Sequence, residues 1–164
     1  MRQGTIFFIS SLLTAQVVHS TCLHGTSLFP RQAKGDAVPV STFSYTGVTG
    51  PLGWAGLKAT NAPCSTSTQQ SPINLDGYIQ KSLVTLDMSI PSVESAEFEN
   101  LGTTVEVVVN GTTSIHNEVF SLKQFHFHTP SEHRIDQEYF PLEIHMVHQA
   151  AGVFHREMVS VTSH

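Results

Sequence analysis

The chain has little charge, no run of basic residues and only two cysteines. Of its 164 residues 13% are charged, and 8 Lys plus Arg stand against 13 Asp plus Glu, for a net charge of −5. Nucleic-acid binding through phosphate neutralisation is therefore disfavoured. The hydrophobic fraction of 40% is enough for a packed core, which excludes a disordered chain. The length predicts a single domain.

Hydrophobic runs long enough to cross a membrane are absent as well. Residues 6–18 form an uncharged, largely apolar stretch, but this is shorter than the roughly 20 residues that a transmembrane helix needs. Arg2 precedes the stretch, and Val18, His19 and Ser20 suit cleavage after Ser20. Residues 1–20 are thus predicted to be a secretory signal peptide, and the mature chain to be secreted, extracellular and without a membrane span.

The two cysteines leave their pairing open. Cys22 lies just after the predicted cleavage site, and Cys64 lies in a predicted loop. They could bridge each other, or Cys64 could require a partner that this chain does not contain, which would permit a disulfide-linked dimer. Asn110, in the sequence Asn-Gly-Thr, is a glycosylation sequon and predicts a glycoprotein if the chain is secreted.

The remainder of the chain predicts a mainly β fold. Residues 21–41 contain Gly and Pro without periodicity and are predicted to be a linker or pro-region. A segment rich in loops follows over residues 42–74. Strands are then predicted at residues 83–86, 103–109, 120–128 and 142–148, with a hairpin turn at Asn110-Gly111 after the second. Because no stretch keeps a 3.6-residue period, helices are expected to be few and short.

Histidine is the unusually placed residue type. Of the 10 histidines, 8 lie between His116 and His164, which indicates metal or acid–base chemistry. Within the third predicted strand, polar and aromatic residues alternate from Gln124 to His128. Because residues two apart on a strand share a face, Gln124, His126 and His128 are expected to point the same way.

The fourth predicted strand repeats this arrangement with Glu143, His145 and Val147 on one face. If the two strands are neighbours with these faces aligned, three imidazoles converge. Three histidines bind Zn²⁺ and leave the fourth tetrahedral position open for water, which is the catalytic arrangement. Gln124 and Glu143, each two residues before a histidine, would orient the ligands.

Other interpretations of the histidines remain. A single His-x-His pair is weak evidence for a metal, and five further histidines could displace one of the three: His116, His133, His148, His155 and His164. His148 falls on the opposite face from His145 and is expected to be a core histidine with hydrogen-bond partners. A metal-dependent oxygenase of cupin type is a third possibility, but it leaves the Gln-Ser-Pro-Ile and Ser-Glu-His motifs unexplained.

Several separated stretches resemble the α-class carbonic anhydrases, zinc lyases that interconvert carbon dioxide and bicarbonate. The similarity covers about residues 43–149 and lies in Tyr45 with Gly50-Pro51 and Trp54, in residues 70–75, in residues 124–128 with 131–133, and in residues 142–148. It implies a twisted, mostly antiparallel central sheet with few short helices. Residues 42–149 would be the N-terminal part of such a domain and residues 150–164 an atypical tail, with the C-terminal strands of the family missing.

The resemblance also implies roles for individual residues. The zinc ligands would be His126, His128 and His145, and their hydrogen-bonding partners Gln124 and Glu143. Val147 would line the pocket for carbon dioxide, Tyr45 would border the water network, and Glu132 would orient the hydroxyl of a threonine found later in the family's chain. The implied reaction is attack of zinc-bound hydroxide on carbon dioxide, followed by export of a proton.

Departures from the family pattern favour an alternative function. Thr103 follows Asn100-Leu101-Gly102, where the family places a proton-shuttle histidine. Counterparts of the late threonine and of the expected partner of Cys64 are lacking. The alternative is therefore a catalytically inactive fragment or binding protein that resembles a carbonic anhydrase and holds zinc without turnover.

Overall fold

The computed structural model describes residues 41–68, 70–115, 118–150 and, as backbone only, 156–163. The predicted signal peptide, all but the last residue of the predicted linker, and Cys22 lie outside these residues. His116, His155 and His164 lie there too.

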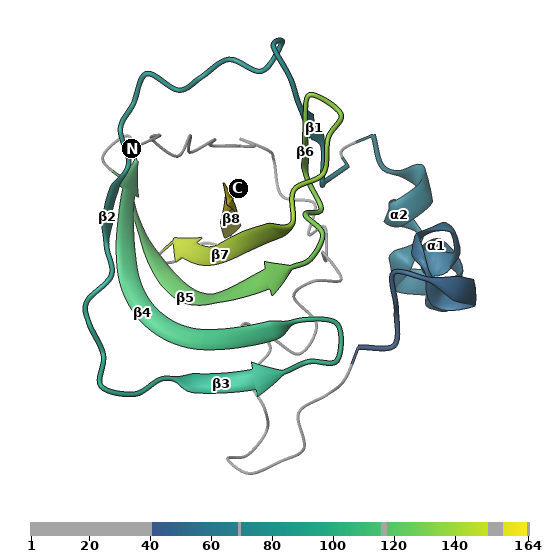
Figure 1. Cartoon of the computed structure of the whole chain (residues 1–164), viewed down its shortest axis with the longest axis horizontal. Coiled ribbons are helices and arrows are strands. Elements are labelled where there is room, and N and C mark those ends of the chain that lie inside the picture. Colours follow the sequence, from purple (N-terminus) through teal and green to yellow (C-terminus); the bar gives the residue numbers. More distant parts are fainter. Residues whose placement is uncertain (1–40, 69, 116–117, 151–155, 164) are drawn as a thin grey trace.

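An antiparallel sheet dominates the described part of the chain, which confirms the mainly β fold predicted from the residues and the antiparallel sheet that the resemblance implies. Its strands are β2 (Asp87–Ser89), β3 (Glu97–Asn100), β4 (Val105–Ile115), β5 (Glu118–His128), β7 (Leu142–Ala150) and β8 (Arg156–Ser163). The order is β2-β4-β5-β7-β8, with β3 also paired to β4. Figure 1 shows β3, β4, β5 and β7 side by side, with β4 and β5 strongly curved.

The strands predicted at residues 120–128 and 142–148 are confirmed as β5 and β7. On β5 the even-numbered residues from Phe120 to His128 are buried, while Phe125 and Phe127 on the other face are half-buried. The two rings pack edge to face with their centroids 5.6 Å apart. The alternation of residue types in the sequence therefore does mark the two faces of the sheet.

The predicted hairpin turn at Asn110-Gly111 is wrong, because both residues lie inside β4. β4 and β5 pair from Glu106 with His126 up to Ile115 with Glu118, and a bulge interrupts the register between Val108 and Gly111. A Cβ atom on Gly111 would come within 2.9 Å of the carbonyl oxygen of Ser89 on β2. The glycine thus permits close approach of a neighbouring strand and does not make a turn.

The strand predicted at residues 83–86 is also wrong. Val84 and Leu86 do pack against the buried cluster of Ile115, Phe120 and Ala150. Backbone pairing begins only at Asp87, which lies opposite Ser114. Alternating apolar residues here indicate which side chains are covered, but they do not show that the backbone is paired.

Short helices precede the sheet. They are η2 (Gly47–Thr49), η3 (Pro51–Gly53), α1 (Trp54–Leu57), η4 (Ala59–Asn61) and α2 (Pro63–Thr66). Proline opens η3 and α2, at a position where its missing N–H costs no hydrogen bond. Cys64 lies in α2 and not in a loop as predicted. Within the described residues, no helix has the length and apolarity that crossing a membrane requires.

A second, two-stranded sheet joins two of the sequence motifs. β1 (Asn74–Leu75) pairs in parallel with β6 (Arg134–Ile135). The motif at residues 70–75 is thereby tied to the segment that follows residues 131–133. The loop before β6 is closed by Ser131, whose amide donates to the carbonyl oxygen of Phe140 over 2.8 Å. This loop carries Glu132 toward the histidines of β5 and β7.

Candidate metal centre

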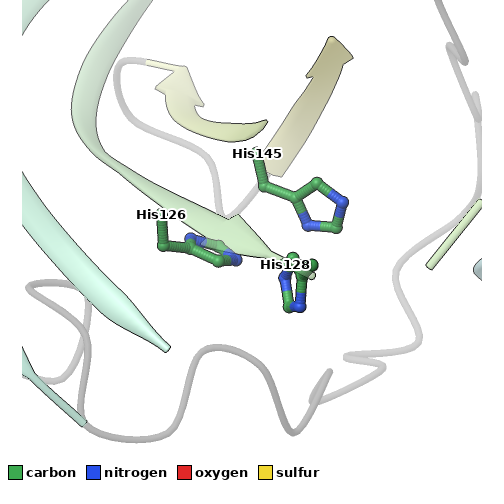
Figure 2. Close-up of side chains that lie close together, drawn as sticks. All are labelled: His126, His128 and His145. Carbon is green, nitrogen blue, oxygen red and sulfur yellow. The ribbon is translucent and has the colours of Figure 1, made fainter. Parts of the chain in front are cut away.

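Three histidines from two adjacent strands meet on one face of the sheet. His126 and His128 lie on β5, His145 lies on β7, and His126 is directly opposite His145 in the register. One ring nitrogen from each lies within 4.8 Å of the others. Figure 2 shows the three rings gathered together. All three are buried, with exposed fractions of 0%, 6% and 1%.

Side chains two residues earlier in each strand hold two of these rings. Nδ1 of His126 lies 3.0 Å from Oε1 of Gln124, and Nε2 of His145 lies 2.7 Å from Oε1 of Glu143. Amide and carboxylate oxygens accept hydrogen bonds, so these ring nitrogens carry the protons. Nε2 of His126 and Nδ1 of His145 therefore hold lone pairs.

These two nitrogens, and one ring nitrogen of His128, have no hydrogen-bond partner in the part of the chain that the structure describes. Nε2 of His126, Nε2 of His128 and Nδ1 of His145 are all buried without such a bond. Buried polar atoms are nearly always satisfied, so three that converge on one point indicate a ligand. Three imidazole nitrogens are a ligand set that Zn²⁺ prefers, and the residues present therefore fit a zinc ion.

The electrostatic environment keeps two of these imidazoles, His126 and His128, neutral. Burial, together with the nearby His145 and His128, lowers the pKa of His126 to about 3. Burial also lowers the pKa of His128, although the carboxylate of Glu132 opposes this. Neutral imidazole is the form that binds a metal, so these two histidines can bind at neutral pH without first losing protons.

Glu143 is anchored by more than His145. Its Oε2 accepts from the backbone amides of Glu132, over 2.6 Å, and of His133, over 2.8 Å. Its Oε1 accepts from Nδ1 of His133 over 2.6 Å. His133, Glu143 and His145 also form a metal-capable group by distance alone. Because their atoms are already joined by hydrogen bonds, we assign His133 to the support of Glu143 and not to a second metal site.

Tyr45 and Glu132 lie beside His128. The hydroxyl of Tyr45 donates to Oε1 of Glu132 over 2.7 Å and lies 3.2 Å from Nδ1 of His128. The other carboxylate oxygen, Oε2, lies 3.4 Å from Nε2 of His128 and 3.9 Å from Nδ1 of His145. The resemblance gives Glu132 a threonine partner, whereas here a tyrosine hydroxyl binds it.

Val147 and His148 are both buried, which strict alternation along β7 does not predict. A register shift on β5 between Leu122 and Gln124 places Val147 opposite Gln124 and His148 opposite Leu122. Val147 is therefore on the face of the three histidines. Nε2 of His148 lies 2.7 Å from Oγ1 of Thr113. His148 is thus a core histidine with a partner, as predicted, and it does not join the cluster.

Sequence reasoning missed Glu106. This residue of β4 is fully buried and lies opposite His126 in the register. The sequence does contain a signal for it: Glu106 is the one charged residue within a run of β-branched residues that predicts a strand, between Val105 and Val107. Thr103, the residue at the expected shuttle position, lies in the loop before β4, with its hydroxyl 3.4 Å from that of Ser41.

Comparison with known proteins yields a family model and relatives that have the name carbonic anhydrase. A sequence model of eukaryotic-type carbonic anhydrases matches residues 49–160. A carbonic anhydrase from Neisseria gonorrhoeae is 36% identical over 110 residues, which cover 65% of this chain and 43% of that protein. Alpha carbonic anhydrase 5 of Arabidopsis thaliana is 30% identical over 162 residues, which cover 90% of this chain and 52% of that protein.

Solved structures agree with the sequence relatives. The fungal alpha carbonic anhydrase from Aspergillus oryzae superposes with a TM-score of 0.61 at 39% sequence identity, over 66% of this chain and 48% of that chain. The chain spans about half the length of the curated relatives it matches.

Proposed function

Because the chain belongs to the eukaryotic-type (alpha) carbonic anhydrase family, we propose that it binds Zn²⁺ and serves the reversible hydration of carbon dioxide to bicarbonate and a proton. The observation that carries the proposal is the convergence of three buried ring nitrogens without hydrogen-bond partners in the described residues. His126, His128 and His145 would hold the ion. Zinc in a three-histidine site generates a nucleophile from water at neutral pH, a property for which carbonic anhydrases are the standard example.

The protein's own residues provide the surroundings of this reaction. Gln124 and Glu143 fix which nitrogen of His126 and of His145 carries the proton. Val147, fully buried on the same face, supplies an apolar wall of the kind that an uncharged gas molecule requires. The carboxylate of Glu132 lies near two of the three lone pairs and can accept a hydrogen bond from a reacting hydroxyl.

Two measurements test the proposal. Zinc content after dialysis should be near one ion per chain for the parent and near zero for a His126→Ala/His128→Ala double mutant. A Lys123→Ala variant of the same strand is the matched control and should retain zinc. Stopped-flow hydration of carbon dioxide should then be faster with the zinc-loaded parent than with the double mutant. Equal zinc in both proteins would overturn the assignment of the ligands.

The inactive zinc-binding protein remains the second candidate. It is favoured by the contacts of Glu132, whose Oε1 accepts from the hydroxyl of Tyr45, whereas the resemblance implies a threonine partner. The same two measurements separate the candidates. One zinc ion per chain without hydration above the rate of the double mutant would identify the inactive protein.

Secretion is proposed on the sequence of residues 1–20. Protein recovered from the medium of a eukaryotic expression host should begin at Thr21. Glycosylation at Asn110 is proposed with it, because Asn110 and Thr112 are both exposed on β4. Treatment with an endoglycosidase should lower the apparent mass of the secreted protein, and Asn110→Gln should abolish that shift.

A further inference from the structure

The third histidine of the cluster differs from the other two in what holds it. His126 and His145 each have a partner two residues earlier on their own strand. Nδ1 of His128 instead lies 3.2 Å from the hydroxyl of Tyr45, 83 residues earlier in the chain. That hydroxyl lies 2.7 Å from Oε1 of Glu132, which comes from the loop before β6.

Counting protons decides the direction of these hydrogen bonds. A tyrosine hydroxyl has a single hydrogen, and a carboxylate can only accept. The hydrogen of Tyr45 is therefore donated to Glu132. The contact between Tyr45 and His128 must then run the other way, with Nδ1 of His128 as the donor. This leaves the lone pair of His128 on Nε2, the atom that is buried without a hydrogen-bond partner in the described residues.

We propose that Tyr45 and Glu132 act as a relay of two hydrogen bonds that fixes the tautomer and the orientation of His128. The inference rests on the proposed zinc site. It makes Tyr45 a positioning residue: Tyr45 accepts from Nδ1 of His128, as Gln124 accepts from Nδ1 of His126. Partners of this kind on metal ligands typically change metal affinity by about 10- to 100-fold.

Opposing contacts make such a relay necessary. Oε2 of Glu132 lies 3.4 Å from Nε2 of His128 and would attract a proton to that nitrogen. A proton there would block the lone pair that a metal needs. Because the hydroxyl of Tyr45 gives its hydrogen to Oε1 of Glu132, its oxygen can accept from Nδ1 of His128. The proton of His128 therefore stays on Nδ1. The hydroxyl of Tyr45 thus counteracts the carboxylate to which it is bound.

The ring of Tyr45 is held independently of its hydroxyl. It packs edge to face against Phe43 and Trp54, with ring centroids 5.9 and 5.7 Å away. The indole N–H of Trp54 donates to the carbonyl oxygens of Ser44, over 2.9 Å, and Thr49, over 3.1 Å. Substitution by phenylalanine therefore keeps these ring contacts and removes only the proposed relay.

A measurement on zinc-free protein tests the tautomer directly. Long-range proton–nitrogen correlation spectra of ¹⁵N-histidine-labelled protein at neutral pH show which ring nitrogen is protonated, and comparison with His128→Gln assigns the signal. We expect the proton of His128 on Nδ1 in the parent and in a Tyr139→Phe control. In Tyr45→Phe a large fraction should move to Nε2. A proton on Nε2 in the parent, or no change in Tyr45→Phe, would overturn the relay.

Zinc affinity, measured by competition with a chelator, gives a second and independent test. Glu132→Gln and Glu132→Leu both remove the negative charge, but only glutamine keeps an oxygen that can accept from Tyr45. We expect Glu132→Leu to bind zinc about 10-fold more weakly than Glu132→Gln. In the Tyr45→Phe background this difference should vanish. An equal difference in both backgrounds would show that Glu132 acts on the metal without Tyr45.

The two outcomes separate this inference from the proposed function. The tautomer is read without zinc and without substrate, so it does not depend on hydration activity. A parent with the expected tautomer but no hydration would retain the relay and reject the enzyme. If Tyr45→Phe fails to fold, as judged by near-ultraviolet circular dichroism of Trp54, the tautomer of His128 in Glu132→Leu still decides. Without its acceptor the hydroxyl of Tyr45 can donate to Nδ1, so the proton of His128 should move to Nε2 in Glu132→Leu and stay on Nδ1 in Glu132→Gln, and a proton on Nδ1 in both would overturn the relay.

Discussion

Glu143 accepts a hydrogen bond from His145, with 2.7 Å between Oε1 and Nε2. The same carboxylate accepts from Nδ1 of His133 and from the backbone amides of Glu132 and His133. One fully buried side chain therefore ties a proposed metal ligand on β7 to the loop before β6. Loss of this carboxylate should affect the metal and the fold together.

Replacement of Glu143 by alanine should weaken zinc binding about 10-fold or more, because His145 loses the acceptor that fixes its proton on Nε2. It should also lower the free energy of unfolding by about 1–3 kcal/mol for each buried donor left without a partner. Chelator competition and urea unfolding measure the two effects. The exposed Glu138→Ala is the control, and an affinity for Glu143→Ala within twofold of the parent would contradict the prediction.

The metal-free protein should lose stability as the pH falls below about 6.5. The pKa of His126 is about 3 when folded against 6.5 for an ordinary histidine, so between these values the unfolded chain binds a proton that the folded chain does not. Stability from this histidine is fully present above pH 6.5 and is lost toward pH 3, by about 1.4 kcal/mol per pH unit. Burial lowers the pKa of His128 and His148 as well, and their contributions have the same sign.

Urea unfolding of metal-free protein at several pH values between 5 and 7.5 measures this slope. The window stays above the range in which ordinary carboxylates titrate. His126→Gln should flatten the dependence, since glutamine has no proton to gain. A parent whose free energy of unfolding does not change over this window would show that the histidines are not held neutral by burial.

External buffer should strongly raise the turnover of zinc-loaded protein. The resemblance places Thr103 where a shuttle histidine is expected, and a hydroxyl does not titrate near neutral pH. Small buffer molecules would then carry the proton away. Thr103→His should reduce the dependence of the stopped-flow rate on buffer concentration, with Thr104→His as the neighbouring control. A parent rate independent of buffer would mean that another group exports the proton.

Hydration by the 164-residue chain should be slow beside that of the same chain extended by the carboxy-terminal half of a relative. The family's threonine partner of Glu132 would be supplied by that half, and positioning losses of this kind cost about 100-fold or more. Stopped-flow rates compared at equal zinc occupancy measure the difference. Equal rates would show that the added half does not complete the site.

Oxidation should produce disulfide-linked dimers through Cys64, which is exposed and unpaired among the described residues. Non-reducing electrophoresis of purified protein should show a dimer that disappears in Cys64→Ser and persists in Cys22→Ser. A monomer with Cys64 bridged to Cys22, found by mass spectrometry of the digested protein, would contradict this.

Sequence periodicity located the part of the site that lies on regular strands. Alternation at Gln124–His126 and at Glu143–His145 gave the shared faces, because a strand repeats every two residues. The turn signal at Asn110-Gly111 failed, since a sequence that favours a turn is also compatible with a bulge where a neighbouring strand comes close. Periodicity could not anticipate the contact of Tyr45 with Glu132, which is 87 residues away and depends on how the bend before η2 and the loop before β6 meet.

The two bulges determine which residues of the sheet can be deleted. β4 carries one extra residue relative to β5, and β5 carries one relative to β7. The extra residue of β5 relative to β7 is Lys123, and the residues on either side of it, Leu122 and Gln124, are both buried. Deleting Lys123 would make the pairing of β5 with β7 regular, but it would leave β4 with a second extra residue relative to β5. It would also turn either the histidines or Phe120 and Leu122 to the opposite face. Substitutions at Lys123 should thus be tolerated where a single-residue deletion is not, because the number of residues in β5, and not the side chain at position 123, decides which face the histidines occupy.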